Sequence, residues 1–158
     1  MGGPCKCGGA YYDEMDNFLQ RKFVVNGRKY ISCEQYFQAM KFEGTDPQYQ
    51  ETIMAHTDGN QLWSLGQTRE RRLREDWEKV KVQVMYEANY AKFEQNEDLR
   101  KVLVNTEGPI EAFGFEFWAY WNGIILERVR EELREEGARN EEHLRKLVQL
   151  MDDFASKA

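Results

Sequence analysis

The chain has 158 residues, of which 41% are hydrophobic and 13% aromatic, which is enough for one domain with its own core. Its formal net charge of -6 argues against a protein that grips nucleic acid mainly by neutralising phosphates, although a single modified nucleotide remains a candidate substrate. No apolar run approaches the roughly 20 residues that span a bilayer, and the N-terminus lacks the apolar stretch of a signal peptide. We therefore expect a soluble protein in the cytoplasm or elsewhere inside the cell, with no membrane partner.

The cysteine and histidine content gives little support for a metal site. The chain has three cysteines, an odd number, and Cys5 with Cys7 supply only two thiolates where a structural zinc needs four ligands. His56 and His143 lie far from that pair in sequence. We expect no metal and no cofactor.

The first structural signal in chain order is a hairpin. Residues 1–9 are rich in glycine and include a proline, so we expect a flexible N-terminal arm that carries no fold information. Two short β-prone segments then flank Asn26 and Gly27, the pair that most favours a tight type I′ turn because both residues tolerate positive φ.

Helical patterns dominate the rest of the chain. Ser32 and Gln35 resemble a capping box and predict a helix to about residue 44. Asp46 and Pro47 predict the start of the next helix, and a short helical piece, QLWSLGQ, follows. The stretch 72–94 keeps apolar residues at helical spacing over about six turns, which predicts the longest, central helix. Later helices are predicted at EDLRKVLVNT, at WNGIILERVREELREEG, and after Asn140.

The helix at residues 32–42, SCEQYFQAMKF, holds an unusual density of chemical groups. At about 100° per residue, four of its side chains share the core face: Cys33, Tyr36, Phe37 and Met40. Glu34, Gln38 and Lys41 fall on the neighbouring arc, and Glu34 lies roughly 10.5 Å along the axis from Lys41. These polar groups either flank a ligand in a cleft or form an ordinary solvated helix face.

The segment CEQYFQAMKF resembles the signature of the NADAR family, the YbiA-like proteins, in which Ser/Val-Glu-His-Tyr-Phe-Gln-Ala-x-Lys-Phe follows a short hairpin. DNF at residues 16–18 lies where the family has Ser-Asn-Phe. The segment LGQTRERRLREDWEKVKVQVMYEANYAKFEQN is similar to the family's Leu-Gly-Arg segment, its central helix and its Lys-Phe-x-Gln-Asn turn. The resemblance covers about residues 10 to 135.

The resemblance implies a hydrolase that cleaves N-glycosidic bonds. Family members release ribose phosphate from riboflavin-pathway intermediates or remove ADP-ribose attached to guanine in nucleic acid. The fold class expected is mainly α with a small β-hairpin, in a single YbiA-like helical domain at residues 10–136. Residues 137–158 are expected to be a helical extension outside the chemistry, packed through one apolar face made of Leu144, Leu147, Val148 and Met151.

Two charged residues are carried over to the scissile bond. Glu34 suits the role of general base or of the group that stabilises a cationic ribose. Lys41 is either a permanent cation that binds phosphate or hydroxyl groups, or a neutral amine that attacks the anomeric carbon and passes through a Schiff base. The ligand-binding residues implied beside them are Asn17, Phe18, Phe37 and Gln38, and Trp77 is either a ring wall of the pocket or a core residue.

One segment departs from the family pattern. Residues 110–130 keep a tryptophan, at Trp118 or Trp121, and have Glu116 where the family has an aspartate, but the family's glycine-rich loop is missing. Asn122 is a remnant of the far end of that loop. We expect Glu116 as a third catalytic candidate, with Trp118 and Asn122 as ligand contacts. The pocket is then either more open and accepts a larger substrate, or it has lost activity.

The arginine-rich run RERRLRE has two interpretations. Interleaved glutamates favour a solvated turn balanced by ion pairs. Alternatively, the run begins the central helix and forms a pyrophosphate clamp with Arg69 and Arg72 as phosphate contacts, because guanidinium groups bind phosphate oxygens bidentately.

The leading hypothesis is a metal-independent glycohydrolase whose partner is an ADP-ribose-bearing guanine nucleotide or nucleic acid, with no obligate protein partner. The first alternative is hydrolysis of a phosphoribosylated pyrimidine from riboflavin metabolism. The second alternative is a module that binds ADP-ribose without cleaving it.

Overall fold

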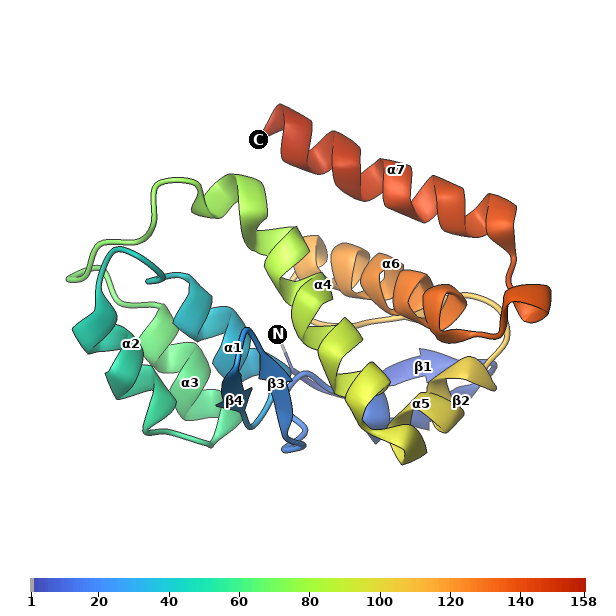
Figure 1. The fold of residues 1–158 in the computed structure, drawn as a ribbon, viewed down its shortest axis with the longest axis horizontal. Coiled ribbons are helices and arrows are strands. Elements are labelled where there is room, and N and C mark those ends of the chain that lie inside the picture. Colours follow the sequence, from blue (N-terminus) through green and yellow to red (C-terminus); the bar gives the residue numbers. More distant parts are fainter. Residues whose placement is uncertain (1) are drawn as a thin grey trace.

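The computed structural model describes residues 2–158, and the predicted class, mainly α with small β elements, is confirmed (Figure 1). The helices are α1 (Cys33–Met40), α2 (Pro47–Met54), α3 (Gly59–Gly66), α4 (Trp77–Gln95), α5 (Glu97–Val104), α6 (Glu116–Leu133) and α7 (Glu141–Lys157). The strands are β1 (Cys5–Cys7), β2 (Ala10–Tyr12), β3 (Phe23–Val25), β4 (Arg28–Tyr30) and β5 (Ile110–Glu111). None of the helices within residues 2–158 combines the length and the apolar character that crossing a membrane requires.

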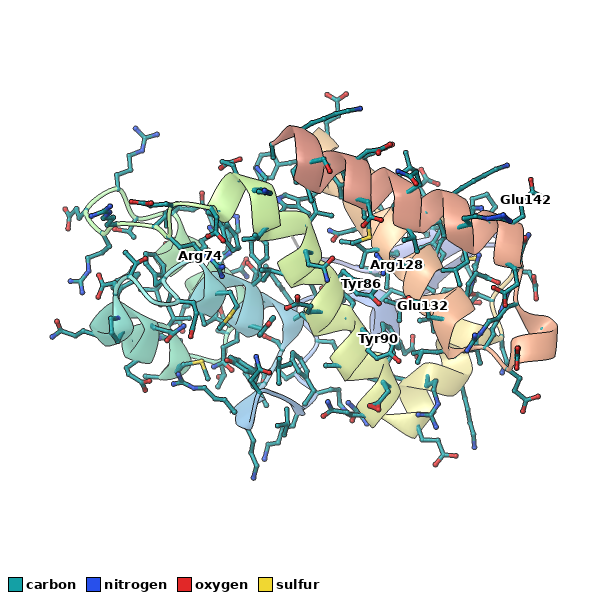
Figure 2. All side chains as sticks on the ribbon, turned by 45° about the horizontal axis from the view of Figure 1, so that its top comes forward. Arg74, Tyr86, Tyr90, Arg128, Glu132 and Glu142 are labelled. Carbon is teal, nitrogen blue, oxygen red and sulfur yellow. The ribbon has the colours of Figure 1, made fainter. Side chains whose placement is uncertain are left out.

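Helix α4 is the central element of the molecule. It runs diagonally between a group formed by α1, α2 and α3 on one side and α6, α7 and the β1 sheet on the other (Figure 1). Its contact with α6 is partly polar: the guanidinium of Arg128 lies 4.0 Å from the ring centroid of Tyr86, and the Tyr86 hydroxyl donates to Glu132 at 2.6 Å (Figure 2). Apolar side chains from both sides complete one continuous core.

The predicted hairpin is confirmed. β3 pairs antiparallel with β4, and the two turn residues, Asn26 and Gly27, have φ of 50° and 79°. These left-handed values are those that the Asn-Gly pair tolerates in a type I′ turn. The buried rings of Phe23 and Tyr30 pack against Tyr36 and so fix the hairpin to α1.

Residues 1–9 are not a mobile arm over the part that the structure describes. β1 is the middle strand of a three-stranded sheet with the order β2-β1-β5, and its thiols, Cys5 and Cys7, are buried in the core. The pairing of Cys7 with Ile110 joins segments about a hundred residues apart. Local composition carries no signal for such a pairing, which is why the glycines around β1 misled the prediction.

The central helix begins at Trp77 and not at about residue 72, so the arginine run lies before the helix. Two contacts hold this run as a loop. Arg71 forms a bidentate pair with Asp46, the N-cap of α2, at 2.7 and 3.0 Å. The backbone N–H of Arg74 donates to the Lys41 carbonyl at 2.8 Å. The run therefore does not begin α4, and its ion pairs agree with the interpretation as a turn balanced by charge pairs, while phosphate binding by Arg69 and Arg72 stays a prediction.

Helix α7 begins as predicted, with Asn140 accepting from the backbone N–H of His143. Leu147 and Met151 are buried against the rest of the fold. The Phe154 ring lies 5.2 Å from Trp121 of α6. The helix thus covers the side of α6 that would otherwise expose aromatic rings.

Candidate active site

The site is built on α1, whose first turn is fixed by its cap. The Ser32 hydroxyl accepts from the backbone N–H of Gln35, and the Gln35 side chain accepts in turn from the N–H of Ile31 at 2.8 Å. This reciprocal arrangement matches the predicted capping box except in one bond: the Gln35 side chain accepts from the N–H of Ile31 and not from that of the N-cap residue Ser32. It fixes the start of the helix on which Glu34, Gln38 and Lys41 are carried.

Glu34 is a carboxylate without access to solvent. It has an exposed fraction of 0%, and one oxygen, Oε1, accepts from the Gln38 amide at 2.7 Å. The other oxygen, Oε2, is buried and has no hydrogen-bond partner among the described residues. Burial raises the pKa of Glu34, and the Gln38 amide opposes that effect. A buried oxygen without a partner is an acceptor ready for a ligand hydroxyl or proton.

Gly66 at the end of α3 closes over these groups. A Cβ at this position would lie 1.7 Å from the Gln38 side-chain oxygen, so only glycine leaves room for the amide. The Gly66 carbonyl also accepts from the Lys41 ammonium at 3.0 Å. One residue of α3 therefore positions two side chains of α1.

Lys41 is a buried amine with a perturbed pKa. Its side chain is 8% exposed, and burial lowers its pKa from 10.5 to about 8, against the opposing charge of Glu34. The nitrogen lies 5.6 Å from the ring centroid of Phe37 and 6.0 Å from that of Trp77. The ammonium is therefore the main form at pH 7, and the neutral amine, which is the nucleophilic form, becomes the main form above about pH 8.

An aromatic cleft opens beside Lys41. It has a volume of about 240 Å³ and is lined by Phe37, Lys41, Trp63, Gln67, Trp77, Phe115 and Trp118. The Phe37 ring meets Trp77 at 4.9 Å and Trp118 at 5.1 Å, both edge to face. Trp77 is 5% exposed and so is part of the core, and it also lines the cleft; its role as a wall for a ligand stays a prediction.

Two polar residues of α4 connect the 16–18 loop to the site. The buried Lys92 ammonium donates to the Asp16 carbonyl at 3.1 Å, and Asn89 donates to the Asn17 side chain at 3.1 Å. The Asn17 carbonyl then accepts from the Glu34 N–H at 3.0 Å. Loop and helix are thereby held in one position, with Asn17 next to the start of α1.

Phe18 lies at a crowded place beside this loop. A Cβ on Gly2 or on Gly59 would come within 2.3 Å of its ring. Two glycines therefore enclose the ring, which is half-buried.

Eight of the twelve predicted site residues do not line the Lys41 cleft: Glu34 and Gln38 on α1, Asn17 and Phe18 in the 16–18 loop, and Glu116, Asn122, Arg69 and Arg72. Glu116 is exposed at the start of α6. Asn122 is buried in α6, and its Oδ1 has no hydrogen-bond partner within residues 2–158. Arg69 is exposed, while Arg72 is 75% exposed at its side chain and pairs with Glu75. Their assignment as ligand or catalytic residues stays a prediction.

The sequence interpretation missed six residues that shape the candidate site. Two of them, Gly66 and Gln67, lie at the end of α3. Trp63 and Phe115 line the cleft, and Asn89 with Lys92 hold the 16–18 loop. A signal existed for Asn89 and Lys92: both residues are polar and lie one turn apart on the otherwise apolar buried face of α4. For Trp63 and Phe115 the signal was weak, because a tryptophan in a short helix and a phenylalanine in a loop usually belong to the core.

A buried carboxyl group and a buried amine of lowered pKa, the amine beside an aromatic cleft, are groups suited to nucleophilic or acid–base attack on a substrate that carries a ring. The NADAR domain model matches residues 9–113, and the chain belongs to this family.

The comparisons with individual proteins agree with this assignment. The chain is 35% identical to the N-glycosidase YbiA of Shigella flexneri over 133 residues, covering 77% of this chain and 82% of the relative. It is 32% identical to a riboflavin biosynthesis protein of Vibrio vulnificus, covering 86% of this chain and 38% of that one. The NMR structure of Escherichia coli YbiA superposes with a TM-score of 0.63 at 30% identity, covering 77% of each chain. The chain is thus an enzyme of the hydrolase class.

Proposed function

We propose that the enzyme removes ADP-ribose from ADP-ribosylated guanine, in a nucleoside or a nucleic acid, with Glu34 and Lys41 at the bond that breaks. The observation that carries the proposal is Lys41, a buried amine with a pKa of about 8 that lines an aromatic cleft. The names of the relatives support cleavage of an N-glycosidic bond. Flat aromatic walls suit a purine ring, which stacks on them.

The two charged residues have complementary roles in the proposed reaction. Breaking the bond from ribose to nitrogen develops positive charge at the anomeric carbon, which a nearby carboxylate stabilises. Glu34 has one oxygen held by Gln38 and the other without a partner among the described residues, so Oε2 is the atom we assign to the ribose.

Lys41 then supplies the nucleophile. The neutral Nζ attacks the anomeric carbon while the C–N electron pair leaves with guanine, which takes up a proton. The proton that guanine takes up is the one that Nζ gives up after attack. The ring oxygen takes up a proton from solvent as the ring opens, which leaves a protonated Schiff base between Nζ and the opened ribose. Water adds to the imine carbon, which releases ADP-ribose and restores the amine.

A smaller substrate is the second candidate. One relative is named a riboflavin biosynthesis protein, and the cleft of about 240 Å³ is below the 300–1,000 Å³ typical of ligand pockets. Both observations favour a phosphoribosylated pyrimidine of riboflavin metabolism. The third candidate, binding of ADP-ribose without cleavage, has no support from the relatives named as glycosidases.

One set of incubations separates these candidates. Wild type, Glu34→Gln and Lys41→Arg are each incubated with an oligonucleotide that carries one ADP-ribosylated guanine, and with a phosphoribosylaminopyrimidine. Release of free ADP-ribose from the oligonucleotide by wild type, and by neither variant, supports the proposal. Release of ribose phosphate only from the pyrimidine supports the second candidate, and tight binding of the oligonucleotide without any release supports the third.

A further inference from the structure

A second cavity lies on another face of α1, where the β3–β4 hairpin meets α1 and α4 (Figure 1). Its volume of about 400 Å³ falls in the range that ligand pockets occupy. Its walls include Tyr36 and Met40 of α1, whereas Phe37 and Lys41 of the same helix line the cleft of the candidate active site. No residue within 2–158 lines both, so the second cavity is a separate place on the molecule.

The hydrogen-bond donors of two side chains in this cavity are already used by the protein. The Gln50 amide nitrogen donates to the Ala39 carbonyl at 2.9 Å and to the Glu43 carboxylate at 2.7 Å. Because both partners are acceptors, the nitrogen is the amide atom that faces them, and the amide oxygen faces elsewhere. The Tyr36 hydroxyl donates its one proton to Glu87 at 2.9 Å. Gln50 and Tyr36 therefore offer a ligand acceptor oxygens and no donor.

Two nearly buried side chains leave an oxygen without a hydrogen-bond partner among the described residues. They are Gln50 and Tyr30, which are 7% and 5% exposed, and both line the second cavity. The atoms that are sealed in the core without a partner belong to other residues, so these two oxygens open to the cavity. Burial raises the pKa of Tyr30, and the charges of Arg28 and Glu43 act on it in opposite directions. The Tyr30 hydroxyl therefore lies near two charged residues of the cavity wall.

The second cavity has more negative charge than its own cations balance. Its two arginines, Arg28 and Arg74, each pair at 2.6 Å with an acid that does not line it. Glu43 and Glu87 line it, and neither is in an ion pair within the part of the chain that the structure describes. Arg74 lies in the field of both glutamates, but its Nε and one Nη nitrogen donate to its own partner at 2.6 and 3.0 Å. A bound cation would offset this excess.

We propose that the second cavity binds the ammonium group of a small aliphatic amine. An ammonium carries a positive charge and three donors, which match the unpaired glutamates and the free acceptor oxygens. An anion fits less well, because it would face two carboxylates while both arginines are engaged. The apolar part of the wall suits the methylene stem of such an amine and is formed by Met40, Val80 and Val84. This inference goes beyond the proposed function and does not rest on it.

The test titrates putrescine, a four-carbon diamine, into the enzyme at low salt by isothermal calorimetry and follows the Met40 methyl signal by NMR. We expect a Kd of about 1 mM or tighter, which is ordinary for so small a ligand, and a shift of the Met40 signal. Butanediol has the same stem with hydroxyl groups in place of the ammonium groups, and succinate is an anion of similar length. Both are expected to bind at least about tenfold more weakly.

Three variants locate the binding. Glu43→Gln removes a charge at an exposed position and is expected to weaken putrescine binding about tenfold. Tyr30→Phe keeps the ring, removes the hydroxyl and is expected to weaken binding about fivefold. The matched control is Glu141→Gln, which makes the same change of charge at an exposed position of α7 away from the cavity, and it is expected to bind like wild type. Circular dichroism and thermal unfolding confirm that each variant is folded.

Several results would overturn the proposal. One is the absence of heat and of a Met40 shift at about 10 mM putrescine, and another is heat without that shift, which would place the diamine elsewhere. Equal affinity of Glu43→Gln, Tyr30→Phe and wild type would also overturn it. An equal loss in Glu43→Gln and Glu141→Gln would reduce the effect to net charge, and butanediol or succinate binding as tightly as putrescine would refute the ligand class. The assay contains no glycosidic substrate, so its outcome is independent of the proposed function.

Discussion

Gly66→Ala tests whether the packing over Glu34 is as tight as the structure indicates. The new Cβ would lie 1.7 Å from the Gln38 side-chain oxygen, about half of an ordinary contact distance, and Gln38 is fully buried. The amide must therefore move, and its hydrogen bond to the Glu34 carboxylate is lost. Gly137→Ala is the matched control, because a Cβ there meets nothing within 4 Å.

The magnitude follows from two costs and one gain. A lost hydrogen bond to a charged group costs about 1.5–3 kcal/mol, and overpacking adds about 1–3 kcal/mol. Alanine in place of glycine regains about 0.5–1 kcal/mol of backbone entropy. The free energy of unfolding should fall by about 2–5 kcal/mol, which lowers Tm by roughly 4–20 °C in a chain of this size.

The assay is thermal and urea unfolding of wild type, Gly66→Ala and Gly137→Ala, together with turnover at equal folded fraction. Loss of the Gln38 contact removes an interaction that opposes the raised pKa of Glu34, so that pKa rises further and turnover at neutral pH falls. If Gly66→Ala and Gly137→Ala unfold within about 0.5 kcal/mol of each other, the packing described around Gln38 is wrong.

Three further predictions concern the pH dependence set by Lys41, the independence of activity from metal ions, and helix α7. Burial lowers the pKa of Lys41 to about 8, so the neutral amine is the main form above that pH. The rate should therefore rise about tenfold per pH unit below pH 8 and then level off. A rate that falls above pH 8 would show that the ammonium is the active form. No group of three or more His, Cys, Asp or Glu within residues 2–158 could hold a metal ion, so activity should survive EDTA, and inhibition reversed by a divalent ion would refute the site as drawn. Deleting residues 140–158 removes the core contacts of Leu147 and Met151 and should lower Tm, while the fraction that still folds keeps near-normal turnover. A large loss of turnover at unchanged helix content would place α7 in the site.

Local signals predicted most of the fold. The Asn26–Gly27 turn, the Ser32 cap and the Asn140 cap are each set by residues within a few positions of one another, and all three are found. The boundary of α4 was wrong because helical spacing continues upstream of Trp77. A tertiary pair, Arg71 with Asp46, holds those residues in a loop instead.

Helical spacing predicted the arrangement of the candidate site only along α1, while the family resemblance supplied Trp77 and Trp118, which line the cleft from α4 and α6. Spacing along α1 placed Glu34, Gln38 and Lys41 on one edge, and the structure adds that all three are buried. The parts contributed by other elements were not predictable in this way. The oxygen of Gln38 is confined by a glycine of α3, and the cleft is completed by Phe115 from a loop, so both depend on how distant segments pack.

Borohydride trapping tests the central claim, attack by Lys41, most directly. The enzyme is incubated with an oligonucleotide carrying ADP-ribosylated guanine, reduced during turnover, and digested for mass spectrometry. Reduction of a Schiff base fixes the opened ribose on the amine, so the account predicts a stable adduct on Lys41 in wild type and none in Lys41→Arg. The absence of an adduct, together with substantial activity in Lys41→Arg, would contradict covalent attack by Lys41 and leave Glu34 to activate water directly.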